Sequence, residues 1–302
     1  KNGEGVKQDL SKAIEYYEQS AKLNNSDALF NLGNLYAKGE VVTQDYSKAI
    51  KYYEQSAKLN DYKAIHKLGI FYKDGLYYKK DYSKAKEHFE KSAEFNYSEA
   101  LNSLGDLYES GFGVEQNYEK ALKYYEKSAK FNNSDAFLKI GNYYFNGFGV
   151  NINYSKAIQY YELSSYFNNS LSHFVLGDIY SNSDVIESDF DKAILYFQKS
   201  ISIETGLITT KYFDGSTLTE YKTNNHRYIS YNDLGLIYHI EKKETEKGID
   251  NIKESAFAEY PFGQNNFGLM SEFYLNKKEN AEYMYQRSSK HNFALAEFNL
   301  GR

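Results

Sequence analysis

The chain has 302 residues, of which 41% are hydrophobic and 25% charged, ordinary values for a folded protein. Its formal net charge of −5 (36 Lys and Arg against 41 Asp and Glu) argues against binding to nucleic acid, which needs a basic stripe. The absence of cysteine excludes disulfides and thiolate metal sites. No long apolar segment is present, so direct membrane insertion is not expected. The cytoplasm is the favoured compartment, with the lumen of the endoplasmic reticulum as the alternative.

Both ends of the chain look cut. It starts at Lys1 without a methionine, inside a Gly-Glu-Gly-Val segment (residues 3–6) that resembles the mid-repeat Gly-Phe-Gly-Val of residues 111–114. It stops at Arg302, in the middle of a repeated helix. A repeat array needs polar capping units at its ends, and we therefore expect this chain to be a piece of a longer polypeptide.

Single residue types recur at a fixed step of 36 residues over the first two thirds of the chain. The glycines of this series are Gly33, Gly69, Gly105, Gly141 and Gly177. The alanines of a second series are Ala13, Ala49, Ala85, Ala121, Ala157 and Ala193. A period of this size is the signature of stacked structural repeats, and it predicts a regular array over residues 1–203.

Each repeat predicts two helices. In residues 26–59, Ser26-Asp27 is expected to cap the first of them, helix A, in which apolar residues follow at spacings of three and four. Gly39 is placed for a left-handed cap at its end, and Gly75, Gly111 and Gly147 share that register.

The second helix, helix B, follows a position that holds only Asp or Asn, which predicts an N-cap. The residues of this register are Asp9, Asp45, Asp81, Asn117, Asn153 and Asp189. Helix B is expected to end near Asn60, because asparagine recurs there at positions 24, 96, 132 and 168.

A glycine inside helix A costs roughly 1 kcal/mol relative to alanine, so it needs a reason. We expect it to let helix B approach closely, with an aromatic ring of helix B as the plug and the small registers of Ser20 and Ala21 completing the contact. The plug register comprises Tyr17, Tyr53, Phe89, Tyr125, Tyr161 and Phe197. The alternative is a stacking platform of rings for bases or sugars, but rings at helical spacing favour a core.

These segments resemble a known family. The runs DALFNLGNLY (27–36), GFGV (111–114) and KALKYYEKSA (120–129) look like Sel-1-like repeats, over about five full units. The resemblance implies an all-α fold: a right-handed α-solenoid superhelix of antiparallel helix pairs, about eight tetratricopeptide-like repeats in this chain. It also implies work as a scaffold or adaptor, including adaptors of membrane-bound ubiquitin ligases in the endoplasmic reticulum.

The period breaks after Ser200. About 22 extra residues precede Gly235, and we place an insertion at residues 204–227. Two β-prone runs around Asp214-Gly215 predict a β-hairpin there, and a disordered loop is the alternative. Residues 228–302 then form shorter repeats, because Gly235, Gly268 and Gly301 are 33 residues apart. Pro261 is expected in the first turn of a helix A.

The sequence contains no recognisable catalytic, cofactor or metal motif. It lacks a phosphate-binding loop and a His-Glu-x-x-His motif, and its six histidines do not cluster at metal-ligand spacing. We therefore expect no enzyme activity, no cofactor and no metal. Asn-x-Ser sequons at positions 24, 96, 132, 153 and 168 are either glycan sites, if the chain is lumenal, or cap and turn residues.

In tetratricopeptide-like arrays helix A lines the concave face, and a partner is expected there, at the positions three before, one after and four after the helix A glycine. Unlike the core registers, these positions differ between repeats. They hold Phe30, Asn34 and Ala37; His66, Ile70 and Lys73; Asn102, Asp106 and Glu109; Leu138, Asn142 and Phe145; Phe174, Asp178 and Ser181. This face combines aromatic rings with acids, so a peptide or helix with apolar and basic residues is expected to complement it. The alternative is ordinary variation of solvent-exposed residues.

Two of these rings, Phe145 and Phe174, lie in adjacent helices A and are expected to form one apolar pocket for an anchor residue. The alternative is that one of them is buried between repeats. The sequence thus predicts a non-enzymatic scaffold that binds proteins or peptides, and no nucleic acid. The alternative function is that of a regulatory or targeting segment of a larger enzyme, such as a kinase or a ubiquitin-ligase-associated protein, including an adaptor in endoplasmic-reticulum-associated degradation.

Overall fold

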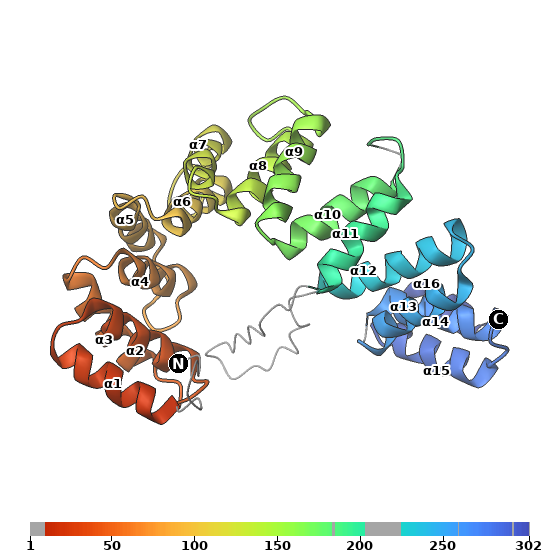
Figure 1. The fold of residues 1–302 in the computed structure, drawn as a ribbon, viewed down its shortest axis with the longest axis horizontal. Helices are drawn as coiled ribbons and strands as arrows, with labels where there is room; N and C mark the ends of the chain where they lie inside the picture. The colour runs from red at the N-terminus through yellow and green to blue at the C-terminus, as the bar shows by residue number, and fades with distance from the viewer. Residues whose placement is uncertain (1–9, 183–184, 203–224, 259, 292, 302) are drawn as a thin grey trace. The chain divides into compact units, whose positions relative to one another are not determined.

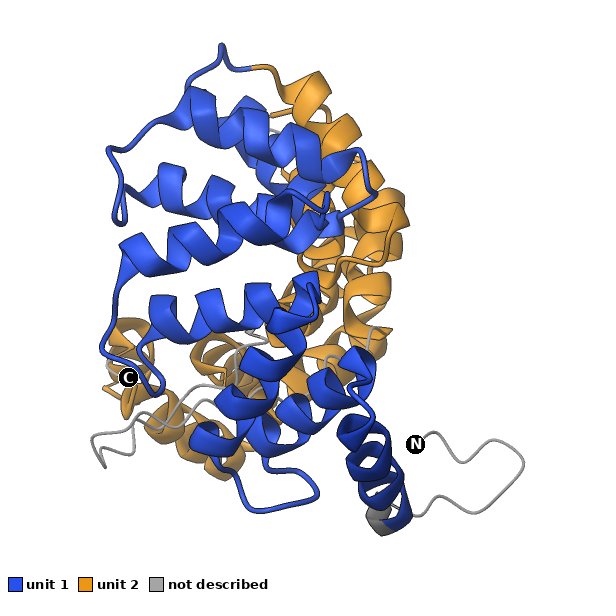
Figure 2. Ribbon diagram, turned by 90° about the vertical axis from the view of Figure 1, so that its left-hand side faces the viewer, with its two compact units in different colours: residues 1–152 blue, residues 153–302 orange. Residues whose placement is uncertain are grey.

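The computed structural model describes residues 10–182, 185–202, 225–258, 260–291 and 293–301. All regular secondary structure in these ranges is helical, as the sequence predicts. The helices divide into two compact units, residues 1–152 and 153–302 (Figures 1 and 2). Each unit is a stack of antiparallel helix pairs, so the chain has the all-α solenoid architecture.

The described residues of unit 1 form eight helices. Their bounds are α1 Leu10–Lys22, α2 Ser26–Lys38, α3 Tyr46–Lys58, α4 Tyr62–Asp74, α5 Tyr82–Ala93, α6 Ser98–Ser110, α7 Tyr118–Ala129 and α8 Ser134–Asn146. The helices α2, α4, α6 and α8 are helices A, and α1, α3, α5 and α7 are helices B. Within this unit the pairs α2–α3, α4–α5 and α6–α7 pack closely, and each helix B also contacts the following helix A (Figure 1).

In unit 2 the described ranges form eight further α-helices and a short π-helix. Their bounds are α9 Tyr154–Tyr166, α10 Ser170–Ser181, α11 Phe190–Ser202, α12 Asn225–Leu236, η1 Ile237–Glu241, α13 Thr245–Phe257, α14 Pro261–Phe273, α15 Lys278–Ser289 and α16 Ala294–Leu300. Here α10, α12 with η1, α14 and α16 are helices A. Pro261 is the first residue of α14, as the sequence predicts.

Helix ends follow the repeat. Gly39, which ends α2, has a φ of 70°, and its N–H donates to the carbonyl of Leu35; the glycines ending α4, α6 and α8 are left-handed in the same way. Asn60, after α3, has a φ of 60°, and Asn24, Asn96, Asn132 and Asn168 match it. Asparagine tolerates this conformation better than most residues. These asparagines therefore act as turn residues between helix B and the next helix A.

The N-cap register of helix B is confirmed wherever the structure describes it. The side chain of Asp45 accepts from the backbone N–H of Lys48 at 2.9 Å, and Asp81, Asn117, Asn153 and Asp189 cap their helices in the same way. Asp9 lies outside the described residues. The cap expected for helix A was wrong by one position: Asn25, not Ser26, accepts from the N–H of Ala28 at 2.9 Å.

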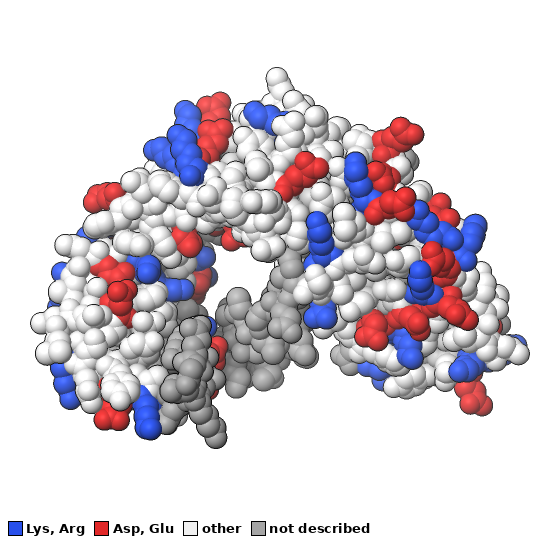
Figure 3. Space-filling view, in the orientation of Figure 1, with Lys and Arg blue, Asp and Glu red and all other residues white. Residues whose placement is uncertain are grey.

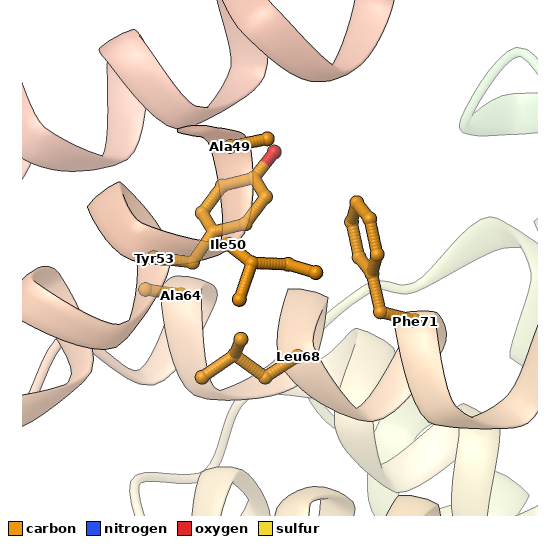
Figure 4. Close-up of a cluster of buried hydrophobic side chains, with 6 residues drawn as sticks. All are labelled: Ala49, Ile50, Tyr53, Ala64, Leu68 and Phe71. Carbon is orange, nitrogen blue, oxygen red and sulfur yellow. The ribbon is translucent and has the colours of Figure 1, made fainter. Parts of the chain in front are cut away.

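The contact between glycine and ring is present as expected. A Cβ atom added to Gly33 would lie 2.6 Å from Cε1 of Tyr53, and one added to Gly69 would lie 2.5 Å from Cε1 of Phe89. Both rings are buried. Figure 4 shows Tyr53 of α3 among Ala49, Ile50, Ala64, Leu68 and Phe71, the core shared by α3 and α4. The rings therefore belong to the core and are not available for stacking on a ligand.

The small serine of helix B has a role that the sequence did not reveal. Ser56 is fully buried, and its hydroxyl donates to the carbonyl of Ser26 at 2.9 Å, at the start of helix A of the same repeat. The bond recurs 36 residues later from Ser92 to Tyr62, at 2.7 Å. It satisfies a hydroxyl that would otherwise be costly to bury.

The contacts that define a repeat continue in unit 2 beyond the insertion. A Cβ atom on Gly268 would lie 2.5 Å from Cε1 of Tyr285, and Ser288 donates to the carbonyl of Pro261 at 2.7 Å.

The loop between the two helices of a repeat is shorter here: four residues, 274–277, join α14 to α15, whereas seven, 39–45, join α2 to α3. The expected insertion falls almost entirely on residues 203–224, outside the described part; its last residues, from Asn225 on, are helical.

Candidate protein-binding surface

We call the exposed side of α2, α4, α6 and α8 the helix A surface of unit 1. Most of the residues expected to line it are half-buried. Two of them, His66 and Leu138, are each only 7% exposed, so a partner on this surface could not contact them. Nε2 of His66 lies 3.0 Å from the hydroxyl of Ser103, and burial lowers the pKa of this histidine to about 3. At neutral pH His66 is therefore an uncharged core residue.

The position after the helix A glycine is tied to the plug ring. In the first full repeat, Asn34 accepts from the hydroxyl of Tyr53 at 2.9 Å. Two repeats later, Asp106 accepts from the hydroxyl of Tyr125 at 2.8 Å. Between them, where the plug is Phe89, the equivalent residue is the apolar Ile70. Asn34 and Asp106 are thus half-buried residues that also accept a hydrogen bond from a buried ring.

An ion cluster lies between α6 and α8. The ammonium of Lys139 lies 2.5 Å from Oε2 of Glu109 and 3.5 Å from Oδ1 of Asp106, and it lies 5.8 Å from the centre of the Tyr125 ring. Burial raises the pKa of Asp106, against the opposing effects of Lys139 and the tyrosine hydroxyl. Burial by itself lowers the pKa of Lys139, but Asp106 and Glu109 outweigh it, so the pKa is raised. These two acids therefore already share one cation within the protein.

The equivalent lysine between α2 and α4 has no such partners. Lys67 is half-buried, and no carboxylate among the described residues forms an ion pair with it. Burial lowers its pKa, Lys38 lowers it further, and Glu99 opposes them. Lys73, also on α4, lies 3.5 Å from Asp74 in an exposed pair. Among the described residues of this part of the surface, Lys67 thus carries a charge without an ion pair, whereas Lys38 and Lys73 have one.

In unit 2 the helix A side carries acids instead. Asp178 of α10 is exposed. Burial raises the pKa of Asp233, on α12, to about 6. A hydrogen bond from Asn232 opposes this shift, and the charge of Asp178 adds to it.

The ring of Phe174 lies 6.2 Å from that of Phe197 and is half-buried. Phe145 lies in unit 1 and Phe174 in unit 2, so the pocket expected between them stays a prediction.

The five remaining residues of the expected set are half-buried: Phe30, Ala37, Asn102, Asn142 and Ser181. The ammonium of Lys63 lies 6.0 Å from the centre of the Phe30 ring, which places this ring beside α4.

In the view of Figure 3, basic and acidic side chains are interspersed over a largely uncharged surface. No group of three or more metal-ligating side chains occurs in the described ranges, and none of the helices described there is long and apolar enough to span a membrane.

Paired helices, a repeated plug and a variable helix A side define the class of helical repeat proteins, the α-solenoids. The sequence model of the Sel1 repeat matches residues 1–25, 26–61, 63–94, 98–130, 134–166 and 170–202. The chain therefore belongs to the Sel1 repeat family. The fold of this family is generally that of a non-catalytic protein-interaction scaffold.

Solved structures agree with this family. The chain is similar to a protective antigen of uropathogenic Escherichia coli that displays an SLR fold, with 25% identity and a TM-score of 0.69. That match covers 99% of this chain but only 61% of the E. coli protein. A Sel1 repeat protein of Oxalobacter formigenes matches with 24% identity and a TM-score of 0.66, over 82% of this chain and 97% of its own.

A third structure, the immunity protein PA5088 of Pseudomonas aeruginosa, matches with 22% identity and a TM-score of 0.52, over 64% of this chain and 73% of its own. At this identity the likeness concerns the fold alone. Among the curated proteins, no sequence matches this chain.

Proposed function

We propose that this chain is a non-enzymatic scaffold that holds a partner protein or peptide on the helix A surface of unit 1. The observation that carries the proposal is the contrast between constant and variable positions. The ring and serine contacts recur from repeat to repeat, from Tyr53 to Phe89 and from Ser56 to Ser92. The residues four positions after the glycine change from Ala37 to Lys73 to Glu109 and are all half-buried.

Packing accounts for the constant positions, because every repeat must bury the same contact. It does not require the accompanying variation in charge and size on the partly exposed side. A surface that differs from one repeat to the next can present a specific pattern of apolar and charged groups to one partner. Protein binding is also the general role of this repeat family.

Site-specific photo-crosslinking tests the proposal. A photoreactive amino acid replaces Lys73, on helix A of one repeat, or Lys91, which is exposed on helix B of the same repeat. After irradiation in a lysate of the source organism, we expect discrete protein adducts from position 73 and none of these from position 91. The same adducts at both positions, or a specific turnover by the purified chain, would contradict the proposal.

A further inference from the structure

Two lysines that occupy the same place in their repeats are in opposite electrostatic situations. Lys67 and Lys139 each lie two positions before the helix A glycine, 72 residues apart (139 − 67). Lys139 is paired with Asp106 and Glu109 of the preceding helix A. In the repeat before Lys67, the matching residues are Asn34 and Ala37, neither of which carries a charge.

The surroundings of Lys67 add to its positive charge. Lys38, at the end of α2 and 3.6 Å from Glu40 in an exposed pair, lowers the pKa of Lys67 in addition to burial. Lys63 extends over Phe30 from the first turn of α4. The acid that opposes them is Glu99, an exposed residue whose carboxylate accepts from the hydroxyl of Ser98 at 2.8 Å. The surface between α2 and α4 therefore carries the half-buried cation Lys67 and the half-buried ring of Phe30, over which Lys63, one helical turn before Lys67, extends.

A partly desolvated charge without a counterion is costly, and a carboxylate that reaches it relieves that cost. We propose that the α2–α4 surface beside Lys67 binds the side-chain carboxylate of an Asp or Glu on a partner protein, in the position that α6 fills for Lys139. An apolar side chain next to that acid would contact Phe30. The inference rests on the proposed scaffold function and names the chemistry of the partner.

Fluorescence polarisation on the full chain tests the inference with two pools of labelled peptides. The first pool carries glutamates and leucines at varied spacing in a Gly-Ser background, with amidated C-termini so that only side chains supply carboxylates. The second pool carries lysines in place of the glutamates. We expect binding of the acidic pool and no binding of the basic pool at the same concentration.

Two single variants locate the site. Lys67→Met keeps the apolar stem but removes the charge, and we expect it to weaken binding of the acidic pool at least about tenfold. Lys51→Met is the matched control, because Lys51 is exposed on helix B of the neighbouring repeat. It changes the net charge equally and should leave binding within about twofold. Circular dichroism checks that both variants keep the helical fold.

Two double variants exchange the residues that differ between the surroundings of Lys67 and those of Lys139. Asn34→Asp with Ala37→Glu installs the acids of α6 beside Lys67, and we expect it to abolish binding of the acidic pool because the site is filled internally. Asp106→Asn with Glu109→Ala removes the acids beside Lys139, and we expect a second site for acidic peptides. Neither outcome depends on Lys67→Met being folded.

Preference for the basic pool, or binding to neither pool, would overturn the inference. So would an acidic-pool affinity that is unchanged in both Lys67→Met and the Asn34→Asp, Ala37→Glu variant. The scaffold function is judged separately: adducts at position 73 but not at position 91 would keep it standing with a partner of different chemistry.

Discussion

The absence of one side chain sets the distance between the two helices of each repeat. The ring of Tyr53 occupies the space that a Cβ atom on Gly33 would need, and the ring of Phe89 does the same at Gly69. The buried phenol then finds an acceptor on helix A, as Tyr53 does in Asn34. A single glycine thus determines both the closeness of the helices and the depth of the ring.

This arrangement predicts that Gly105→Leu destabilises the protein by about 1–3 kcal/mol, because the added side chain collides with the ring of Tyr125 and overpacks the core. Chemical denaturation followed by circular dichroism measures the change. The control is Lys123→Leu on the exposed side of α7, which adds the same side chain without a collision. Equal stability of the two variants would show that the glycine does not mark a close approach.

At the scale of the element, helix ends are set by single polar side chains at fixed positions. Asp81 accepts from the N–H of Lys84 at 3.0 Å at the start of α5, and Asn117 accepts from that of Lys120 at 2.8 Å at the start of α7. Either oxygen satisfies a backbone donor that has no partner inside the helix. The repeat therefore accepts Asp or Asn here without a change of structure.

We expect Asp81→Ala to cost about 1 kcal/mol of stability, the usual effect of losing an N-cap. Asp81→Asn should stay within a few tenths of a kcal/mol of the original chain, since Asn117 fills the same role naturally. Urea titrations of the two variants make the comparison. If the asparagine variant loses as much as the alanine variant, the carboxylate charge rather than the cap hydrogen bond is what matters.

At the scale of the whole molecule, stability comes from contacts between neighbours in a stack. Helix α7, for example, packs against α6 and α8, and α14 packs against α13 and α15, with few contacts at longer range in the described ranges. In such an array the free energy of unfolding is close to the sum of the stabilities of the single repeats and of the interfaces between neighbouring repeats. A destabilising substitution therefore acts mainly on its own repeat and the adjacent ones.

Tyr125→Ala should therefore act mainly on its own neighbourhood. Loss of a fully buried ring costs on the order of 3–5 kcal/mol. We expect faster amide hydrogen exchange in α6, α7 and α8, with protection in α14 and α15 unchanged. Exchange resolved by peptide mass spectrometry gives the readout, and Tyr285→Ala should show the opposite pattern. Uniform acceleration along the chain would indicate that the repeats unfold as one cooperative block.

Much of the architecture could be read from the sequence because packing repeats wherever the repeat does. The helix pairs, the glycine beside the ring, the Asp or Asn cap of helix B and the position of Pro261 all follow from a period or from local backbone chemistry. The start of helix A was one residue off, since Asn25 and Ser26 are both good caps and only the backbone conformation distinguishes them.

The charge pairing on the helix A surface of unit 1 was decided by the tertiary structure alone. From the sequence, Asp106, Glu109 and His66 were all expected to face a partner on helix A. In the fold, Lys139 of the next helix A forms ion pairs with both acids, which lie 33 and 30 residues earlier in the chain (139 − 106 and 139 − 109). His66 lies buried beside Ser103. Periodicity specifies which positions face one another, but whether a given side chain is paired depends on what the neighbouring repeat supplies. That is why Lys67, alike in register to Lys139, is left with its charge unmatched.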